Sequence, residues 1–157
     1  NTKEGPWFEE YAQAGKKPSF ALNGHIFALE GLARLQPYTD SFDRLINGAI
    51  KATEERIDMY DAGLWSRYDL RGTPANQKYH HIHVQQLYWM ATNWGSSKLQ
   101  GMGRKFLWQQ VVPFSSIYRV LTYPNRFLVF IFGVNIAAIF SVLFLAFIIK
   151  NRAKAKE

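Results

Sequence analysis

Apolar side chains recur at every third or fourth position soon after the start of the chain, at Leu22, Ile26, Leu29 and Leu32. This spacing predicts a first helix over about Ser19–Leu35, with Ser19 as its N-cap and Pro37 just beyond its end. We expect a second helix to begin near Asp40, whose side chain would cap it. The apolar stripe of this second helix consists of Phe42, Leu45, Ile46, Ala49, Ile50 and Ile57.

The next stretch, Tyr60–Lys78, follows neither the helical nor the strand period and contains two glycines and a proline. We expect a polar loop there, with a short β-like hairpin around Trp65–Leu70. Apolar periodicity then predicts a third helix over about His80–Trp94 and a fourth over about Ser97–Val112. The predicted fold class is all-α, with helical hairpins joined by long irregular loops.

A run of 23 uncharged residues, Phe127–Ile149, stands apart from this pattern. A bilayer core takes roughly 20 apolar residues in a helix, so the run predicts a single transmembrane helix. The basic residues that follow favour a cytoplasmic C-terminus, with the polar domain in the periplasm, at the cell surface or in a secretory lumen. The chain then divides into a helical domain (1–112), a linker (113–126), the membrane helix (127–149) and a basic cytoplasmic tail (150–157).

Composition narrows the classes of function. The chain has no cysteine, which excludes disulfides, thiolate nucleophiles and cysteine zinc sites. Its net charge is +7, so its surface would attract a polyanion: nucleic acid, anionic lipid or an acidic polysaccharide. No nucleic-acid-binding motif accompanies the charge, which makes nucleic acid the weakest of the three. Aromatic residues make up 16% of the chain and suit either a sugar-binding surface or an aromatic core.

Candidate chemistry is concentrated in two stretches, Trp7–Glu30 and Tyr60–Leu87. His80 and His83 lie three apart and could share a helix face, but no carboxylate partner has the spacing of a metal ligand set. We therefore predict no metal, and expect these histidines to orient neighbouring side chains. Polar loops held by rigid helices are common places for binding and catalytic groups.

Arg71 follows Tyr68 by three residues, so the two side chains can face one cleft if the turn is tight. A guanidinium suits bidentate binding of a carboxylate. The alternative is that Arg71 pairs with Asp69 or Asp61 and only braces the loop. Glu9 and Glu10 likewise suit a site beside Trp7, or are ordinary solvated charges.

Several spaced motifs in one order resemble the C-terminal domain of the D-glucuronyl C5-epimerase family. They are WFEEY, PSFALNGHIFALEGL, YDAG, RYDLR and YHHIHVQQL, within about Trp7–Val112. The resemblance implies the C-terminal part of an (α/α) helical barrel that converts glucuronate to iduronate in a heparan-type polysaccharide, without a cofactor. Phe8 stands where the family has a tyrosine, and the Tyr68–Tyr79 connection is several residues shorter.

The resemblance also assigns roles to individual residues. It implies that Tyr11, Tyr68 and Tyr79 are catalytic tyrosines and that Glu10 and Arg71 are polar active-site residues. The implied supporting or substrate-binding residues are Trp7, Asn23, His80 and His83. Two tyrosines can supply the base and the acid that inversion at C5 requires, while Arg71 stabilises the developing enediolate.

Two other functions remain open on the sequence. A polysaccharide lyase would start from the same carbanion and expel the C4 substituent instead. The second is a catalytically inactive sugar-binding or assembly subunit held in the lipid bilayer. Each of these functions is compatible with an oligomer. The chain begins with Asn rather than Met, and we expect it to be the C-terminal part of a longer protein.

Overall fold

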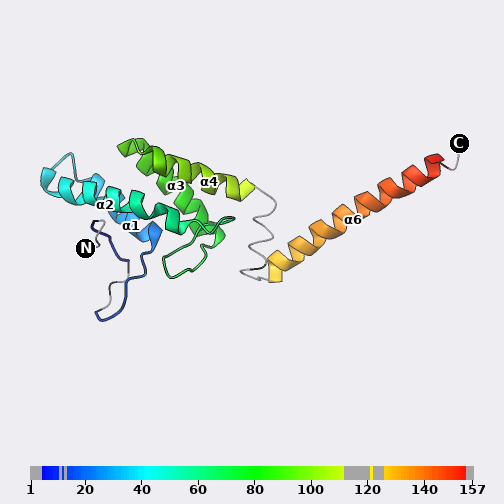
Figure 1. Ribbon diagram of the computed structural model, residues 1–157, viewed down its shortest axis with the longest axis horizontal. Helices are drawn as coiled ribbons and strands as arrows, with labels where there is room; N and C mark the ends of the chain where they lie inside the picture. Colours follow the sequence, from blue (N-terminus) through cyan, green and yellow to red (C-terminus); the bar gives the residue numbers. More distant parts are fainter. Residues whose placement is uncertain (1–4, 11, 13, 112–120, 122–125, 155–157) are drawn as a thin grey trace. The chain divides into compact units, whose positions relative to one another are not determined.

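The computed structural model describes residues 5–10, 12, 14–111, 121 and 126–154. The chain forms two compact units, residues 1–112 and 113–157. The elements of the first unit are drawn in Figure 1: α1 (Leu22–Ala33), η1 (Asp40–Phe42), α2 (Asp43–Arg56), η2 (Ile57–Tyr60), α3 (Gln77–Trp94) and α4 (Ser97–Val111).

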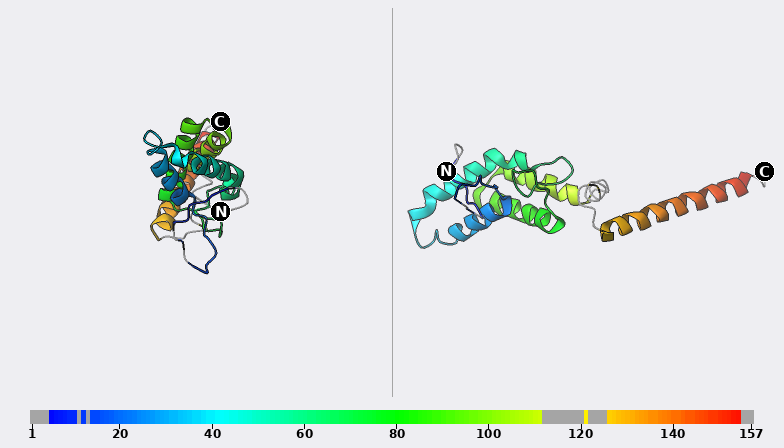
Figure 2. Two further views of the ribbon diagram at one scale, coloured as in Figure 1. Left: turned by 90° about the vertical axis from the view of Figure 1, so that its left-hand side faces the viewer. Right: turned by 90° about the horizontal axis from the view of Figure 1, so that it is seen from below.

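Helices α3 and α4 form a hairpin, with α1 packed against α3 and η2 against α4; Figure 2 gives two further views of this unit. The hairpin turns at Gly95, whose φ of 69° is the left-handed conformation that ends many helices. Ser96 then caps α4 by accepting from the backbone N–H of Leu99, and its hydroxyl donates to Glu54 of α2. Helix α1 packs against both α2 and α3.

A continuous apolar core lies between these helices. It includes the periodic positions that predicted the first two helices, except Leu45, which is exposed, together with residues from α3 and α4 such as Leu87, Met90, Leu99 and Phe106. Burying an aliphatic or aromatic side chain of this size stabilises the fold by roughly 1.5–3 kcal/mol. The buried apolar positions that predicted the helices therefore also stabilise the packing of these helices against one another.

Two predicted helix caps are wrong. Helix α1 begins at Leu22, and Ser19 instead donates its hydroxyl to Glu9. Phe20 has a φ of 57°, which takes the chain off a helical path between Ser19 and Leu22. Asp40 does not cap the second helix, because Thr39 accepts from the backbone of Ser41 and starts η1 before α2 begins.

The third and fourth helices agree closely with the prediction, apart from an earlier start for α3. Asn76 caps α3 by accepting from the backbone N–H of Tyr79 at 3.0 Å. The polar loop before it carries two isolated antiparallel bridges, Asp61 with Ser66 and Arg67 with Pro74. The described part of the first unit is thus helical without a named strand, and the (α/α) barrel stays a prediction.

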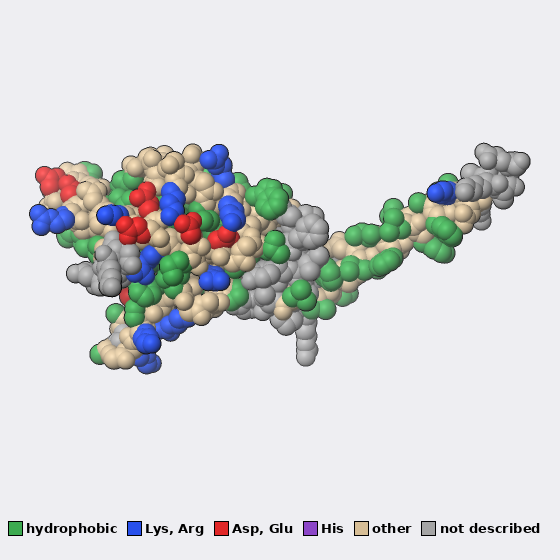
Figure 3. Space-filling model, viewed as in Figure 1, with side chains coloured by type: hydrophobic (Ala, Val, Ile, Leu, Met, Phe, Trp, Pro, Cys, Tyr) green, Lys and Arg blue, Asp and Glu red, His purple; other side chains and the backbone are tan. Residues whose placement is uncertain are grey.

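The second unit contains α6 (Arg126–Lys154), a single long helix. Its segment Phe132–Asn151 is long and apolar enough to cross a membrane, and none of it is buried. Figure 3 shows hydrophobic side chains along the length of this helix. The Ser141 hydroxyl donates to the carbonyl of Ala137, so this polar side chain has its hydrogen-bond partner within the helix.

Candidate active site

Two of the predicted tyrosines meet in the first unit. The rings of Tyr68, in the polar loop, and Tyr79, in the first turn of α3, lie 4.8 Å apart in an edge-to-face arrangement. The Tyr68 hydroxyl donates to Glu10 Oε2 at 3.0 Å, so the N-terminal segment joins the pair. We call Tyr68, Tyr79 and Glu10 the phenol cluster. Tyr11 lies outside the described residues.

The polar loop holds Tyr68 in place through its backbone. The Tyr68 carbonyl accepts from the Leu22 N–H at 3.1 Å, and the Tyr68 N–H donates to the Thr73 carbonyl at 2.7 Å. Asp69 closes the turn, because its carboxylate accepts from the backbone N–H groups of Arg71 and Thr73 and from the Thr73 hydroxyl. A loop tied at this many points presents its phenol in a fixed position.

Gly24 explains how Glu10 comes so close to α1. A Cβ at this position would lie 2.9 Å from the Glu10 Cβ and 3.1 Å from Glu10 Oε2, the atom that accepts from Tyr68. The absence of a side chain at Gly24 therefore leaves room for the carboxylate. Asn23, the residue before it, is buried, and its carbonyl accepts from Gln86 of α3. Its side-chain oxygen has no hydrogen-bond partner within the described structure.

His80 and His83 are fully buried rather than exposed in a cleft. His80 Nε2 lies 2.9 Å from the Phe106 carbonyl and therefore donates to it, which leaves His80 Nδ1 as the acceptor for Ser66. The Ser66 hydroxyl also lies 3.1 Å from His83 Nδ1. Burial, with a smaller contribution from His80, lowers the pKa of His83 to about 3. Both histidines thus hold the loop to α3 and α4, while His81 is exposed.

His25, which the sequence did not single out, forms a second buried site. Its Nδ1 accepts from the Phe8 N–H at 3.0 Å, and its Nε2 lies 3.0 Å from the Thr53 hydroxyl. Burial lowers the pKa of His25 to about 4. Trp7 stacks on His25 with ring centroids 3.8 Å apart and an angle of 9°. The predicted substrate-binding Trp7 is thus a half-buried part of an aromatic stack.

Arg71 does not form either of the predicted ion pairs. Its guanidinium donates to the Lys17 carbonyl, and only its backbone contacts Asp69. Asp61 instead accepts from Lys105 and from Gln109 of α4. Burial alone would raise the pKa of Asp61, but these hydrogen bonds and one from the Gly63 N–H lower it.

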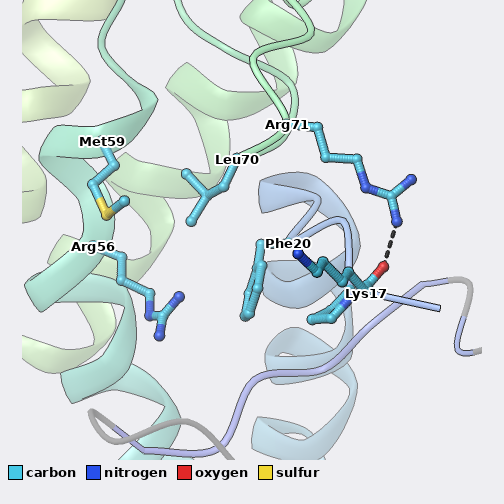
Figure 4. A pocket seen from close by; sticks show the side chains of 7 residues that line it. Lys17, Phe20, Arg56, Met59, Leu70 and Arg71 are labelled. Carbon is cyan, nitrogen blue, oxygen red and sulfur yellow. Dashed lines mark hydrogen bonds between the residues drawn. The ribbon is translucent and has the colours of Figure 1, made fainter. Parts of the chain in front are cut away.

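Arg71 lines a pocket of about 630 Å³ that Figure 4 shows from close by. Its other lining residues are Lys17, Pro18, Phe20, Arg56, Met59 and Leu70. We call this the basic pocket. Neither phenol of the cluster is among its described lining residues. The sequence did not predict that Lys17 and Arg56 line a pocket, or that Glu9 forms hydrogen bonds with Ser19 and Phe20. The spacing of these residues does not distinguish them from ordinary surface charges.

No group of three His, Cys, Asp or Glu side chains in the described part of the chain is placed to hold a metal ion. What the phenol cluster offers chemically is hydroxyl groups, for donating or accepting a proton, and a carboxylate. A phenol has a pKa near 10, so it carries a proton in water at neutral pH. Proton transfer is therefore the chemistry that these side chains suit.

Comparison with known sequences gives a family match over most of this unit. Residues 1–107 match the family described as "D-glucuronyl C5-epimerase C-terminus". An uncharacterised protein of Methanocaldococcus jannaschii is 35% identical over 91 residues, which cover 57% of this chain and 29% of that protein. A D-glucuronyl C5-epimerase of Caenorhabditis elegans is 31% identical over 106 residues, covering 54% and 17%. The chain spans less than a third of the length of either relative.

Proposed function

The chain belongs to the D-glucuronyl C5-epimerase C-terminal family, and from this premise we propose that it is a membrane-anchored uronate C5-epimerase. Its substrate would be an acidic polysaccharide of the heparan or heparosan type, in which D-glucuronate residues become L-iduronate. The observation that carries the proposal is the phenol cluster, in which Tyr68 and Tyr79 contact each other and Glu10 accepts from Tyr68.

The reaction needs a base on one face of the sugar ring and an acid on the other. The base takes H5 as a proton, and the electrons of the C5–H bond move into the carboxylate to give an enediolate. The acid then gives a proton to C5 from the opposite face, the electrons return to carbon, and the configuration is inverted. Both steps balance without an oxidant or a reductant.

The surroundings of the two phenols favour different roles. Tyr68 donates to a carboxylate, a hydrogen bond that favours the protonated phenol and suits the acid. Tyr79, in the first turn of α3, is then left as the base. Tyr11, three positions beyond Phe8 in the family motif, would be a third phenol at the cleft.

Arg71 would stabilise the enediolate by binding the substrate carboxylate. Its guanidinium is exposed and donates to a backbone carbonyl, which a carboxylate can replace as a stronger, charge-assisted acceptor. Asn23, His80 and His83 would act by holding α1, α3 and the polar loop together. No metal or other cofactor has a part in this proposal.

Helix α6 would anchor the protein in the membrane. Lys150 and the basic residues after it favour the cytoplasmic side, so the helical domain would lie outside the cytoplasm. A reporter fused after Glu157 tests this topology. A reporter that is active only outside the cytoplasm would reverse the assignment.

Solvent exchange at C5 tests the proposed activity directly. The full-length protein is incubated with unsulfated heparosan in heavy water, and deuterium at C5 is measured by nuclear magnetic resonance. We expect deuterium uptake together with iduronate signals. No uptake by folded protein would overturn the proposal, and growing ultraviolet absorbance from an unsaturated uronate would identify a lyase instead.

A further inference from the structure

The basic pocket lies apart from the phenols that would transfer protons. Its walls come from three separate stretches: the segment before α1, the end of α2 with η2, and the polar loop. Figure 4 shows Phe20 and Leu70 between Arg56 on one side and Arg71 on the other. A volume of about 630 Å³ exceeds the needs of a single small anion and falls within the range of small-molecule sites, roughly 300–1,000 Å³.

The charges of this pocket all have one sign. Lys17, Arg56 and Arg71 line it, and none of its described lining residues is acidic. Neither Lys17 nor Arg71 forms an ion pair with a carboxylate of the described structure. Acidic residues in or beside these stretches have other partners. Asp69 accepts from the loop backbone, Asp58 pairs with Lys98 at 2.8 Å, and Glu9 accepts from the Ser19 hydroxyl and the Phe20 N–H. Like charges gathered around one hollow favour an anionic ligand.

The apolar wall of the pocket is held in an unfavourable conformation. Phe20 has a φ of 57°, which is rare for a bulky residue. Two hydrogen bonds support it: its N–H donates to Glu9 Oε2 at 3.0 Å, and its carbonyl accepts from the Tyr60 hydroxyl at 2.6 Å. Backbone strain that the surrounding structure supports is common at ligand sites.

The same wall orients Arg56. Its guanidinium carbon lies 4.7 Å from the centroid of the Phe20 ring and 5.8 Å from that of Trp7. These contacts fix a cation beside an aromatic face before any ligand arrives. A ligand that fits must present an anionic group to the cations and an apolar face to Phe20 and Leu70.

We propose that the basic pocket is a subsite for a second sugar of the polysaccharide that carries an acidic group, either an N-sulfated sugar beside the one that reacts or the next uronate, one sugar further along. Its carboxylate or sulfate group contacts Arg56 and Lys17, and the C–H face of its ring packs on Phe20. This inference rests on the proposed function. Arg71, three residues after Tyr68, belongs both to this pocket and to the predicted reaction site, which makes the two sites neighbours along the bound polymer.

Binding measured without turnover tests the subsite. An unsulfated heparosan oligosaccharide is titrated into the full-length protein in a non-ionic detergent, and the dissociation constant is measured by calorimetry. We expect Arg56→Met and Lys17→Ala each to weaken binding by about tenfold or more, which corresponds to the loss of one charge-assisted contact. Arg44→Met removes the same charge from an exposed position of α2 and serves as the matched control, with less than a twofold effect.

Thermal melting shows whether each variant is folded. If Arg56→Met does not fold, Lys17→Ala still tests the pocket, because the Lys17 side chain is exposed and its removal should not affect folding. The N-sulfated oligosaccharide provides the second arm. A larger loss with the sulfated ligand identifies a sulfate in the pocket, and an equal loss identifies the carboxylate. If both variants bind as tightly as Arg44→Met, the subsite proposal is overturned.

Turnover separates this proposal from the proposed function. In the folded variants we expect KM for the polymer to rise about tenfold while kcat for C5 exchange is unchanged, because the pocket does not contact the reacting carbon. If the wild type exchanges at C5 and the variants change neither KM nor binding, only the subsite proposal is overturned. If the two variants lose binding but the wild type itself shows no exchange at C5, the epimerase proposal is overturned and the binding site remains. Reduced binding to anionic vesicles, with oligosaccharide binding intact, would make the pocket a lipid site and also overturn the proposal.

Discussion

Two faces of the stretch Tyr60–Leu87 use similar side chains in opposite ways. Tyr79 and His80 are neighbours in the first turn of α3, yet Tyr79 faces Tyr68 near the surface and His80 is fully buried against Ser66 and Phe106. Tyr60 is buried as well, and its hydroxyl serves the Phe20 carbonyl. The inward face thus binds the loop to the helices, and the outward face presents phenols.

Hydrogen bonds on the inward face allow an irregular loop to keep a reactive side chain in a fixed position. Ser66, His80 and Asp69 hold the loop through hydrogen bonds, and each such bond removes freedom from the backbone that carries Tyr68. Buried hydrogen bonds are expensive to leave unmade, so they define one arrangement strongly. The outward phenols keep a hydroxyl that solvent or a sugar can approach. Changing one face at a time separates positioning from chemistry.

The largest effect should come from the outward face. Tyr79→Phe and Tyr68→Phe each remove one proton-transferring hydroxyl, and we expect C5 exchange to fall by about 10²–10⁴-fold. Stability should change little, because neither hydroxyl supports the core. Tyr38→Phe, at an 85% exposed position, is the control and should exchange normally. Full exchange in either cluster variant would remove that phenol from the mechanism.

The buried histidines of the domain should make its free energy of unfolding depend on pH. The pKa values of His25 and His83 are lowered to about 4 and about 3, whereas an unfolded histidine titrates near 6.5. Below pH 6.5 the unfolded chain takes up protons that the folded domain does not, so stability falls as the pH falls. At pH 5 the loss is on the order of 2 kcal/mol for each histidine.

Urea unfolding at pH 7, 6 and 5 measures this loss. His83→Gln should flatten the dependence, while His81→Gln, at an exposed position of the same helix, should leave it unchanged. A free energy of unfolding that does not vary over this range would show that the two histidines are not buried as described.

Ser66→Ala is a smaller change to the same face. It removes the hydroxyl that lies 2.7 Å from His80 Nδ1 and 3.1 Å from His83 Nδ1. We expect a loss of about 1–3 kcal/mol in the free energy of unfolding, because buried ring nitrogens lose a partner. Ser97→Ala, at the exposed start of α4, should cost far less. Equal effects of the two substitutions would contradict the bracing role of Ser66.

The smallest effect compares two glycines of α1. Gly31→Ala meets nothing within 4 Å and should stabilise the protein by about 0.5–1 kcal/mol, through helix propensity. Gly24→Ala places a methyl group against Glu10, so part of that gain should be lost and C5 exchange should fall several-fold. Thermal melting and exchange on both variants check this. Normal exchange in Gly24→Ala would show that Glu10 need not stay beside Tyr68.

Periodicity predicted the helices well and their caps poorly. Helices α3 and α4 lie close to the predicted ranges because their apolar faces pack on each other, as the spacing indicated. Ser19 failed as a cap because Glu9 and Tyr60 hold Phe20 in a conformation that local propensity disfavours. Contacts that distant residues make can overrule a local preference of this size, and no local signal announces them.

The candidate site was predictable in its members but not in its arrangement. Family motifs pointed to Tyr68, Tyr79 and Glu10, which the structure brings together, and their catalytic roles stay predictions. Arg71 was expected either in the active site or paired with Asp69 or Asp61; its guanidinium donates to the Lys17 carbonyl, and its catalytic role stays a prediction. Lys17 and Arg56 belong to separate stretches, so only folding could gather them around one pocket.

The order of apolar and polar residues was enough to predict a helical domain and a long apolar helix after it, and the spaced motifs were enough to indicate the family. Those properties depend on spacing and motif, which neighbouring residues carry. Three properties appear only in the folded chain: which tyrosines and histidines face inward, where the strained turn at Phe20 lies, and which cations line one pocket. Burial and charge at a point depend on everything packed around it, and a linear sequence does not say which segments those will be.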